Sequence, residues 1–290
     1  MCLQKLKGEQ GIELAGLVRI RFEEGQASYE PLYSLTKEQR GQLEILLNAL
    51  RVLPPLPPLD FVVTLAPSFD RPLLLQATTI PIFARSKEKH NQKVVLFPHL
   101  GAHTQPRLIP WEEKMNKALW RGSPTDGLYT YFDWDCRLRA RIALLSCRYR
   151  DLLDAGLTQS PLLNMYMTDW LTREGVLASP LIPDEQTAYK YLLSLDGKST
   201  PSSFRWQLLS QSLIFKAESN RIEWFYRGLV PGQHYLSFSD DILEKIHWAQ
   251  THDEEAKAIA QEAYAFALEL DDKAYLYHLL QAYSQKHLAE

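Results

Sequence analysis

The stretch that decides the fold, Tyr189–Lys216, reads YKYLLSLDGKSTPSSFRWQLLSQSLIFK. Residues 189–195 and 213–216 are short apolar runs of the kind that form buried strands. Between them, residues 202–210 are predicted to form a helix that follows a loop containing glycine and proline. A strand, a loop, a helix and a second strand in this order indicate a βαβ unit with a right-handed crossover. The sequence therefore predicts an α/β fold.

Similar patterns occur toward the N-terminus. A Glu24-Gly25-Gln26 turn is flanked by two strands that are predicted to pair as a hairpin. Thr36 and Gln39 form a capping box that starts a helix to about residue 50, and the prolines of 54–58 end it. The predicted strands of this part of the chain lie at 17–22, 27–33, 60–65, 79–84 and 93–97.

The middle of the chain is less regular. Charged residues at helical spacing predict a helix over 111–119, and 120–124 is typical of a turn. An arginine-rich helix is predicted over 136–150, and the proline-broken region 159–185 is predicted to form long loops. The last part, 240–289, is predicted to be almost wholly helical.

Composition and charge exclude several classes of protein. The chain has 290 residues, 46% of them hydrophobic and 23% charged, which is typical of one large globular domain or two modest ones. The formal net charge of -3 argues against a general nucleic-acid binder, whose affinity comes mainly from neutralising phosphates. No apolar run is long enough to span a membrane, and the first residues lack the apolar core of a secretory signal. With 3 cysteines and no CxxC spacing, these features predict a cytoplasmic protein.

Several catalytic motifs are absent or incomplete. The sequence contains no GxGxxG and no HExxH. The triplet Gly197-Lys198-Ser199 lacks the earlier glycine of a phosphate-binding loop, because that position is Leu192. The triplet is therefore not interpreted as a nucleoside triphosphate site.

Two short patterns suggest a metal, but their surroundings favour other roles. Asp133 and Asp135 have the DxD spacing that some glycosyltransferases use to hold a divalent ion, yet their aromatic and cationic neighbours favour a structural role. His99 and His103 would share one face of a helix, but the residues between them are typical of a loop. Two lone histidines are interpreted as core or surface residues rather than bases: His234 and His247.

The loop after Leu195 is the strongest candidate site. In open α/β sheets, ligands bind beyond the carboxyl ends of the strands, beside the next helix. Ser202 and Ser203 are suited to cap that helix, and free amides at its start attract an anion. Arg205 in the first turn opposes the helix dipole, and a bound anion would remove that conflict. The alternative is a solvated arginine that tolerates a small electrostatic cost.

Asp70 follows the predicted strand at 60–65. A carboxylate beyond the carboxyl end of a strand is placed to act as a general base if a second domain packs opposite. The alternative is a turn aspartate that precedes Pro72.

A set of short motifs extends beyond the deciding stretch, and together they are more specific than any one of them. The motifs are Ile80-Pro81-Ile82-Phe83 through Ser86-Lys87, Trp120-Arg121-Gly122-Ser123, Tyr189-Lys190-Tyr191-Leu192, Asp196-Gly197, Ser203-Phe204-Arg205-Trp206, Leu213-Ile214-Phe215-Lys216, Glu223-Trp224-Phe225-Tyr226, Leu229-Val230-Pro231 and His234-Tyr235. From Asp60 to its C-terminus the chain resembles glycosyltransferase family 90. That family includes Rumi-type protein O-glucosyltransferases, capsule xylosyltransferases and bacterial lipopolysaccharide-modifying transferases.

The resemblance implies a GT-B-like fold, in which two Rossmann-like domains face a cleft and the C-terminal helices pack back on the first domain. The first domain is expected to be small, over 1–115 together with 270–290, and to lie on the acceptor side. The second, over 116–269, is expected to bind the nucleotide sugar.

The resemblance also implies inverting, metal-independent transfer of a hexose or pentose from a UDP-sugar, with no other cofactor. The acceptor would be a glycan of the lipopolysaccharide or capsule type, a lipid-linked glycan or a protein hydroxyl. An enzyme at the inner face of the membrane, bound peripherally, is compatible with the cytoplasmic prediction.

The residues that match the family motifs are assigned roles on this basis. Asp70, whose surrounding motif departs from the family pattern, would be the base. Glu223 is a candidate for the ribose hydroxyls, with a strand-edge carboxylate as the alternative. The other donor-binding candidates are Arg121, Gly122, Ser123, Arg139 (or its neighbour Arg141), Gly197, Ser202, Ser203 and Arg205.

Two rival functions remain open at this point. A degenerate member of the same fold would bind a nucleotide or a glycan without turnover. A phosphate-binding enzyme of another reaction class would use the same Arg205 pocket and would depend on a divalent metal.

Overall fold

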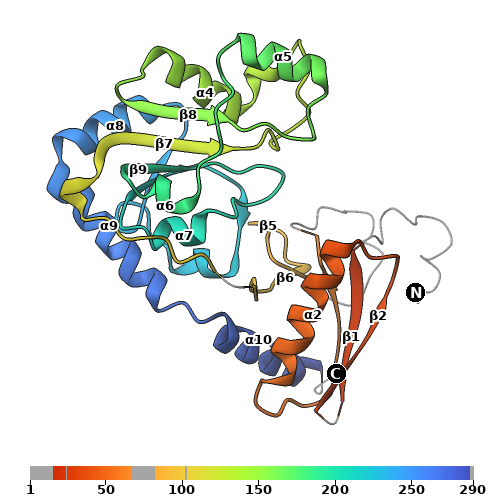
Figure 1. Ribbon diagram of the computed structural model, residues 1–290. Coiled ribbons are helices and arrows are strands. Elements are labelled where there is room, and N and C mark those ends of the chain that lie inside the picture. Colours follow the sequence, from red (N-terminus) through yellow and green to blue (C-terminus); the bar gives the residue numbers. More distant parts are fainter. Residues whose placement is uncertain (1–15, 24, 67–81, 102, 288–290) are drawn as a thin grey trace. The chain divides into compact units, whose positions relative to one another are not determined.

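The computed structural model describes residues 16–23, 25–66, 82–101 and 103–287, and it has the predicted α/β composition (Figure 1). The chain divides into two compact units. The first unit comprises Met1–Ala102, Asn220–Arg227 and Asp271–Glu290, and the second comprises His103–Ser219 and Gly228–Leu270. The division falls after residue 102 rather than after residue 115. The segment at 220–227, which the sequence placed in the second domain, belongs to the first unit.

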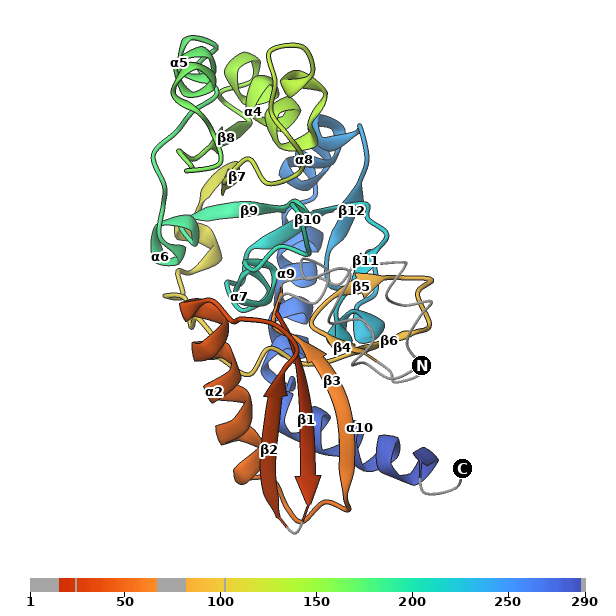
Figure 2. The same cartoon turned by 90° about the vertical axis from the view of Figure 1, so that its right-hand side faces the viewer.

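The first unit is built on a five-stranded sheet in the order β2-β1-β3-β4-β6. Its strands are β1 (Leu17–Glu23), β2 (Gln26–Pro31), β3 (Leu59–Thr64), β4 (Ile82–Ala84) and β6 (Val94–Leu96). The predicted hairpin is confirmed, because β1 and β2 are antiparallel (Figure 2). β1 also runs antiparallel to β3, whereas β3, β4 and β6 are parallel to one another. The carboxyl ends of these last strands therefore meet at one edge of the sheet. The first residues of the strand predicted at 79–84 lie outside the described ranges.

Helix α2 (Lys37–Arg51) begins at the predicted capping box. The Thr36 hydroxyl accepts from the backbone N–H of Gln39 at 3.2 Å, and the Gln39 side chain accepts from the backbone N–H of Thr36 at 3.0 Å. These reciprocal bonds satisfy two amides that a helix start leaves without partners. The apolar face of α2 packs Leu46 and Leu50 into the core of the first unit beside Phe61.

Helix α10 (Asp272–His287) completes that core. Leu276 and Leu280 are fully buried in the same cluster as Phe61, and the Tyr283 hydroxyl donates to the carbonyl oxygen of Asp60 at 3.0 Å. Burying one such leucine contributes about 1.5–3 kcal/mol. The last helix therefore packs on the first unit, as predicted, whereas the two helices before it belong to the second unit.

The segment at 220–227 joins the first unit through a short ribbon. β5 (Lys87–Glu88) pairs antiparallel with β11 (Arg221–Ile222), and the 3₁₀ helix η3 (Trp224–Gly228) follows. The ring of Trp224 stacks on Tyr275 of α10, with ring centroids 4.3 Å apart.

The second unit contains a five-stranded sheet of parallel strands in the order β12-β10-β9-β7-β8. Its strands are β7 (Met115–Gly122), β8 (Leu153–Leu157), β9 (Tyr189–Ser194), β10 (Leu213–Ala217) and β12 (Leu236–Phe238). The predicted βαβ unit is confirmed: β9, helix α7 (Phe204–Leu208) and β10 follow in this order, with Leu213 opposite Tyr191. The first strand along the chain, β7, lies between the second and the third.

Three predictions for the middle of the chain are wrong, and one of them is the turn at 120–124, whose first three residues belong to β7. Instead of a helix over 111–119 there is a single 3₁₀ turn, η1 (Trp111–Glu113), followed by β7. Residues 159–185 are not only loops, because they contain α5 (Met165–Arg173) and α6 (Pro183–Gln186). The Asn164 side chain caps α5 by accepting from the backbone N–H of Met167 at 2.8 Å, and Pro183 opens α6.

Helices cover the second sheet. A further 3₁₀ turn, η2 (Trp134–Cys136), leads into α4 (Leu138–Arg148), which lies within the predicted helix at 136–150. The predicted helical C-terminal part is confirmed as α8 (Ile242–Thr251), α9 (Asp253–Leu268) and α10. One core joins Ile142 of α4 and Ile246 of α8 to Leu193 of β9.

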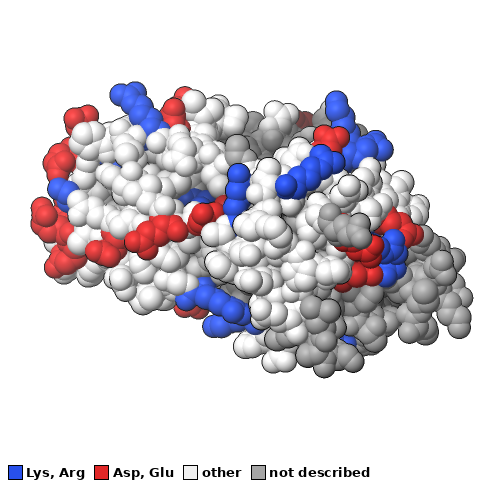
Figure 3. Space-filling view, turned by 90° about the horizontal axis from the view of Figure 1, so that it is seen from below, with Lys and Arg blue, Asp and Glu red and all other residues white. Residues whose placement is uncertain are grey.

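One face of the molecule shows charges of both signs. On the face shown in Figure 3, the Lys and Arg side chains of the described residues are interspersed with Asp and Glu, so this face offers no uniformly basic surface to a phosphate backbone. No helix among the described residues is both long enough and apolar enough to cross a bilayer.

Candidate functional site

The second sheet has a topological switch point between β7 and β9. The chain leaves β7 toward β8 on one side and later returns to add β9 on the other side. At such a point the loops that follow the two strands diverge and leave room for a ligand at the carboxyl edge. In this unit those loops are 123–127 after β7 and 195–203 after β9. The candidate site is therefore built from these two loops (Figure 2).

Arg139 of α4 holds the two loops in place. Its guanidinium donates to the carbonyl oxygens of Ser123 at 2.5 Å and Leu195 at 2.8 Å. It also donates to the carbonyl oxygen of Asp196 at 3.1 Å and the hydroxyl of Thr125 at 2.8 Å. A planar guanidinium with five N–H donors is suited to such a junction.

The environment of Arg139 explains why a charge is tolerated there. The residue is only 8% exposed, and its guanidinium lies 5.5 Å from the centre of the Trp120 ring. Burial lowers the pKa of Arg139, and the nearby Asp126, Tyr129 and Asp196 act in the opposite direction. The predicted donor-binding arginine is thus already engaged by protein oxygens and supports the loops of the site.

Gly197 is required by the close approach of the two loops. A Cβ atom at this position would lie 2.2 Å from the Thr125 hydroxyl oxygen and 2.7 Å from an Nη of Arg139. Both distances are far below van der Waals contact, so a side chain here would push the loops apart. The structure therefore brings the predicted residues Ser123, Arg139 and Gly197 together.

A charged pair lies at the same edge, and neither of its residues was predicted to belong to the site. Asp196 follows β9 and Lys216 lies in β10, and their charged groups are 3.6 Å apart. The Ser219 hydroxyl donates to the other oxygen of Asp196. The Lys216 side chain is only 8% exposed and lies over the Phe204 ring. The sequence did contain a signal for this pair, because a charged residue stands at the carboxyl end of each of two apolar strands.

Arg121 faces β8 instead of the switch point. Its Nη2 donates to a carboxylate oxygen of Asp154 at 2.7 Å, and its Nη1 donates to the carbonyl oxygen of the same residue at 2.9 Å. Its Nε donates to the carbonyl oxygen of Ser179 at 3.1 Å. With these bonds, Arg121 joins β7 to its neighbour.

The next two residues of the predicted Trp-Arg-Gly-Ser motif end β7. The Gly122 carbonyl oxygen accepts from the backbone N–H of Thr158 at 2.9 Å. A Cβ at Gly122 would lie 2.6 Å from the Trp120 ring, so glycine lets that ring fold over the strand end. The Ser123 hydroxyl lies 3.3 Å from that of Thr158.

The predicted capping by Ser202 and Ser203 is wrong in its detail. Ser203 is the N-cap residue of α7, but its side chain makes no capping hydrogen bond. The reason is local: the backbone at Ser203 is already helical, and the N–H of Phe204 donates to the carbonyl oxygen of Pro201 at 3.1 Å.

Arg205 lies in a helix of only five residues, so its first turn is also its last. The predicted conflict with the helix dipole therefore has little weight, because the dipole of such a short helix is small. One guanidinium nitrogen donates to the carbonyl oxygen of Leu270 at 3.1 Å. A phosphate-binding role for Arg205 stays a prediction.

The remaining predicted residues lie elsewhere. Asp70 lies outside the described residues. Glu223 belongs to the first unit, directly after β11. Burial lowers the pKa of Arg85, and the charge of Glu223 partly offsets this effect. The predicted contact of Glu223 with a ribose stays a prediction.

Asp133 makes local contacts. It accepts from the hydroxyl of Thr130 at 2.5 Å and from Arg137 at 2.6 Å, and the Thr130 hydrogen bond is the main cause that lowers its pKa. Asp135 is exposed. Within the described ranges, no group of three or more His, Cys, Asp or Glu side chains is arranged to hold a metal ion. His99 lies in a stretch, 97–101, without helix.

His234 is a core histidine, as predicted. Its Nδ1 accepts from the backbone N–H of Val230 at 2.9 Å, its ring packs on Phe266, and the residue is 6% exposed. Burial lowers the pKa of His234. Protonation of Nδ1 would remove the acceptor of this hydrogen bond.

This geometry predicts an acid-sensitive contribution to stability. Because the folded pKa lies below the ordinary value of about 6.5, the unfolded chain binds the proton more readily, so this contribution is lost as the pH falls. His234→Asn keeps an acceptor without a titrating ring, so its unfolding free energy should fall less than that of the wild type between pH 7.5 and 5. Urea unfolding at several pH values measures this, with the exposed His247→Asn as control. Parallel curves for wild type and His234→Asn would contradict the assignment.

The chain is similar to several known proteins. Over 194 residues the chain is 32% identical to protein O-glucosyltransferase 2 of Danio rerio, covering 63% of this chain and 35% of that protein. It is 31% identical over 183 residues to protein O-glucosyltransferase 3 of Mus musculus, covering 61% of this chain and 33% of that protein. The matched part thus spans about a third of the length of these relatives.

Among solved structures, TarM has a TM-score of 0.48 at 10% identity, covering 72% of this chain and 45% of that one. The HepE structure from Anabaena in complex with UDP and glucose has a TM-score of 0.41 at 10% identity, covering 61% and 49%. The model of glycosyl transferase family 90 matches residues 101–289, which include the whole switch-point site. Because this match extends over more than half of the sequence, the chain belongs to glycosyl transferase family 90.

Proposed function

We propose that the chain is a glycosyltransferase that moves a hexose or pentose from a UDP-sugar to a hydroxyl of a lipopolysaccharide- or capsule-type glycan or of a protein. The observation that carries this proposal is the switch point of the second unit. There, Arg139 and Gly197 hold two polar loops together at the carboxyl edge of β7 and β9. This edge is the position at which doubly wound sheets bind nucleotides. Family membership and the names of the relatives support transfer to a hydroxyl.

The donor diphosphate needs positive charge and N–H groups where negative charge develops on departure. Lys216 contributes a cation at the carboxyl edge of the sheet, close to the loop of Gly197. In this proposal Arg205 and the amides near Ser202 and Ser203 complete the diphosphate contacts. Arg139 supports these contacts indirectly, because its guanidinium group donates to carbonyl oxygens of the two loops. Arg121 supports the sheet instead, because its guanidinium group pairs with Asp154 of β8.

The proposed reaction is a single displacement. Asp70 takes the proton of the acceptor hydroxyl as that oxygen attacks the anomeric carbon, and UDP leaves from the opposite face. One displacement inverts the anomeric carbon, so an α-linked donor gives a β-linked product. The leaving charge is met by cations and amides of the protein, so the proposal includes no metal.

Metal independence gives a direct test. UDP should raise the melting temperature equally with and without EDTA, because its diphosphate is assigned to protein groups. Ligand present at a hundred times its dissociation constant stabilises the folded state by about 2.7 kcal/mol, which a thermal-shift assay detects. A large loss of UDP affinity on chelation would overturn the proposed mechanism. It would favour a metal-dependent reaction class, with Asp133 and Asp135 as the first candidates to hold the metal ion.

The assignment of Arg205 to the diphosphate predicts a selective loss. Arg205→Ala should weaken the binding of UDP by roughly ten- to a hundred-fold, which is the effect of one charge-assisted hydrogen bond. The binding of uridine should weaken much less. Calorimetric titration with both ligands measures the difference. The exposed Arg148→Ala in α4 is the control and should change neither affinity. Equal losses for UDP and uridine would mean that Arg205 supports the fold through Leu270.

A further inference from the structure

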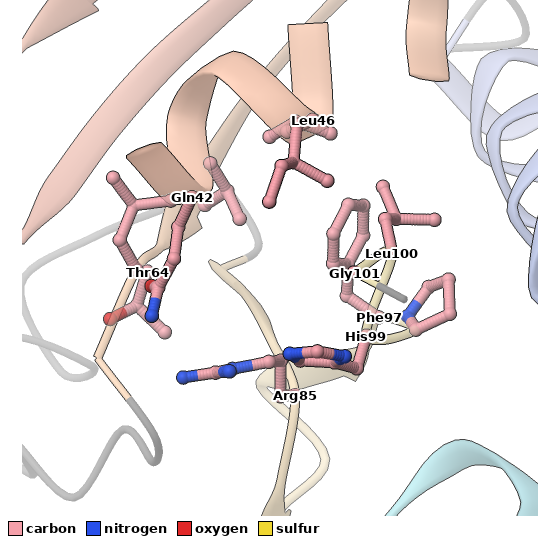
Figure 4. A pocket seen from close by; sticks show the side chains of 12 residues that line it. Gln42, Leu46, Thr64, Arg85, Phe97, His99, Leu100 and Gly101 are labelled. Carbon is pink, nitrogen blue, oxygen red and sulfur yellow. The ribbon is translucent and has the colours of Figure 1, made fainter. Parts of the chain in front are cut away.

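The first unit contains a pocket of its own at the carboxyl ends of its parallel strands. It is bounded by α2, by the ends of β3 and β4 and by the residues after β6, and it is open to solvent. Figure 4 shows apolar side chains, Leu46, Phe97 and Leu100, on one side, and the polar side chains of Gln42, Thr64 and Arg85 on the other.

Arg85 is the principal charge in this pocket. It follows β4 directly and is half-buried. No hydrogen bond or ion pair joins its guanidinium to another described residue. Burial lowers its pKa, while Glu223 and Glu38 partly offset this effect from a distance. A half-buried guanidinium has lost much of its water, so an anion with oxygens in the pocket would replace those lost hydrogen bonds.

The neighbours of Arg85 suit a sugar that carries such an anion. The Thr64 oxygen already accepts from the backbone N–H of Ala66 at 3.1 Å, so its O–H can donate. The Gln42 side-chain nitrogen donates to Glu38 at 3.3 Å, which leaves its oxygen to accept from a hydroxyl.

The other residues that line the pocket also suit a sugar that carries an anion. His99 also lines the pocket (Figure 4). Its ring packs so closely on Gly101 that a Cβ there would come within 2.7 Å of it. The apolar wall of Leu46 and Phe97 fits the C–H face of a pyranose ring.

We propose that this pocket binds a sugar residue of the acceptor that carries a carboxylate or a phosphate group, with Arg85 on the anion and Gln42 on a hydroxyl. As a statement about the acceptor, the proposal rests on the proposed glycosyl transfer. As a statement about the pocket, it can be tested by binding alone.

The probes are methyl β-D-glucuronide, glucose 6-phosphate and the neutral methyl β-D-glucoside, titrated without any donor by ligand-observed NMR. At least one charged sugar should bind roughly tenfold or more tightly than the neutral one. Which charged probe binds tells a carboxylate from a phosphate. Arg85→Gln should abolish the preference, whereas Arg51→Gln, an exposed arginine at the end of α2 that bonds Asn48, should leave it unchanged. Gln42→Ala should weaken charged and neutral probes alike.

Equal binding of the three sugars, no binding of either charged sugar, or an unchanged preference in Arg85→Gln would each overturn the proposal. Melting curves of the variants show that they are folded. A parallel UDP titration separates this proposal from the proposed function. Charged sugars that bind through Arg85 while UDP does not bind would contradict UDP-sugar transfer and leave the anion pocket standing.

Discussion

Replacing Asp70 by asparagine is expected to lower the rate of sugar transfer by about 10²–10⁴-fold, the usual contribution of a general base. Asparagine keeps the size of the side chain but cannot take a proton from the acceptor hydroxyl. UDP binding and the melting temperature should therefore change little. The measurement is the initial rate of transfer from a UDP-sugar, with UDP affinity determined on the same preparation.

Asp60 offers a matched control on the strand that precedes Asp70. Its carboxylate accepts from Arg19 at 2.7 Å on the partly exposed start of β3. Asp60→Asn should cost at most about 1 kcal/mol of stability and leave transfer near the wild-type rate. If Asp70→Asn transfers as fast as the wild type, the base lies elsewhere.

The stereochemistry of the product is a second readout of the same mechanism. An α-linked UDP-sugar should give a β-linked product, because the single displacement inverts the anomeric carbon. An α-linked product would refute the inverting mechanism, whatever Asp70→Asn does. A wild-type chain that binds UDP but transfers no sugar would instead favour the alternative function, in which a degenerate member of the same fold binds a nucleotide or a glycan without turnover.

The parts of the fold that could be predicted are those whose signal is local. The capping box at Thr36 satisfies amides within one turn, so the start of α2 follows from a few adjacent residues. The apolar runs at 189–195 and 213–216 are short and bounded by turn residues, and both became buried strands. Such signals depend little on distant parts of the chain.

The start of β7 could not be predicted because its partners are distant in sequence. Lys114 looked like one charge on an exposed helix, but it is only 4% exposed. Its ammonium group donates to the carbonyl oxygens of Thr187 at 2.6 Å and Ser210 at 3.1 Å. Burial lowers its pKa to about 8. Only the folded sheet brings these oxygens together, so the charge pattern alone favoured the wrong element.

The candidate site could be predicted only in part from the sequence, for a similar reason. The loop after β9 was found from the rule that ligands bind beyond the carboxyl ends of strands, and Gly197 lies in that loop. The membership of Glu223 in the first unit depends on the pairing of β5 with β11, which no local pattern announces.

The second prediction with a large expected effect concerns Arg139. The sequence assigned this residue to binding of the sugar donor, whereas in the structure its guanidinium group donates to carbonyl oxygens of the two loops. Arg139→Gln should lower the unfolding free energy by roughly 3–5 kcal/mol, because it removes charge-assisted hydrogen bonds and leaves buried carbonyl oxygens without donors. For a chain of 290 residues that corresponds to a fall in melting temperature of roughly 5–8 °C. UDP affinity should fall as well, since the loops at 123–127 and 195–203 lose the side chain that joins them.

Arg141, two residues further along α4, is the matched control. Its side chain is 50% exposed and pairs with Asp240 at 2.5 Å, so Arg141→Gln should cost less than about 1 kcal/mol. Thermal and urea unfolding of both variants measure the contrast, with a UDP titration below the melting temperature. If Arg139→Gln were as stable as Arg141→Gln yet failed to bind UDP, the guanidinium would have to leave its carbonyl partners and contact the diphosphate itself. Loss of stability together with loss of affinity would instead assign Arg139 the role that its geometry indicates, as the support on which the nucleotide loops depend.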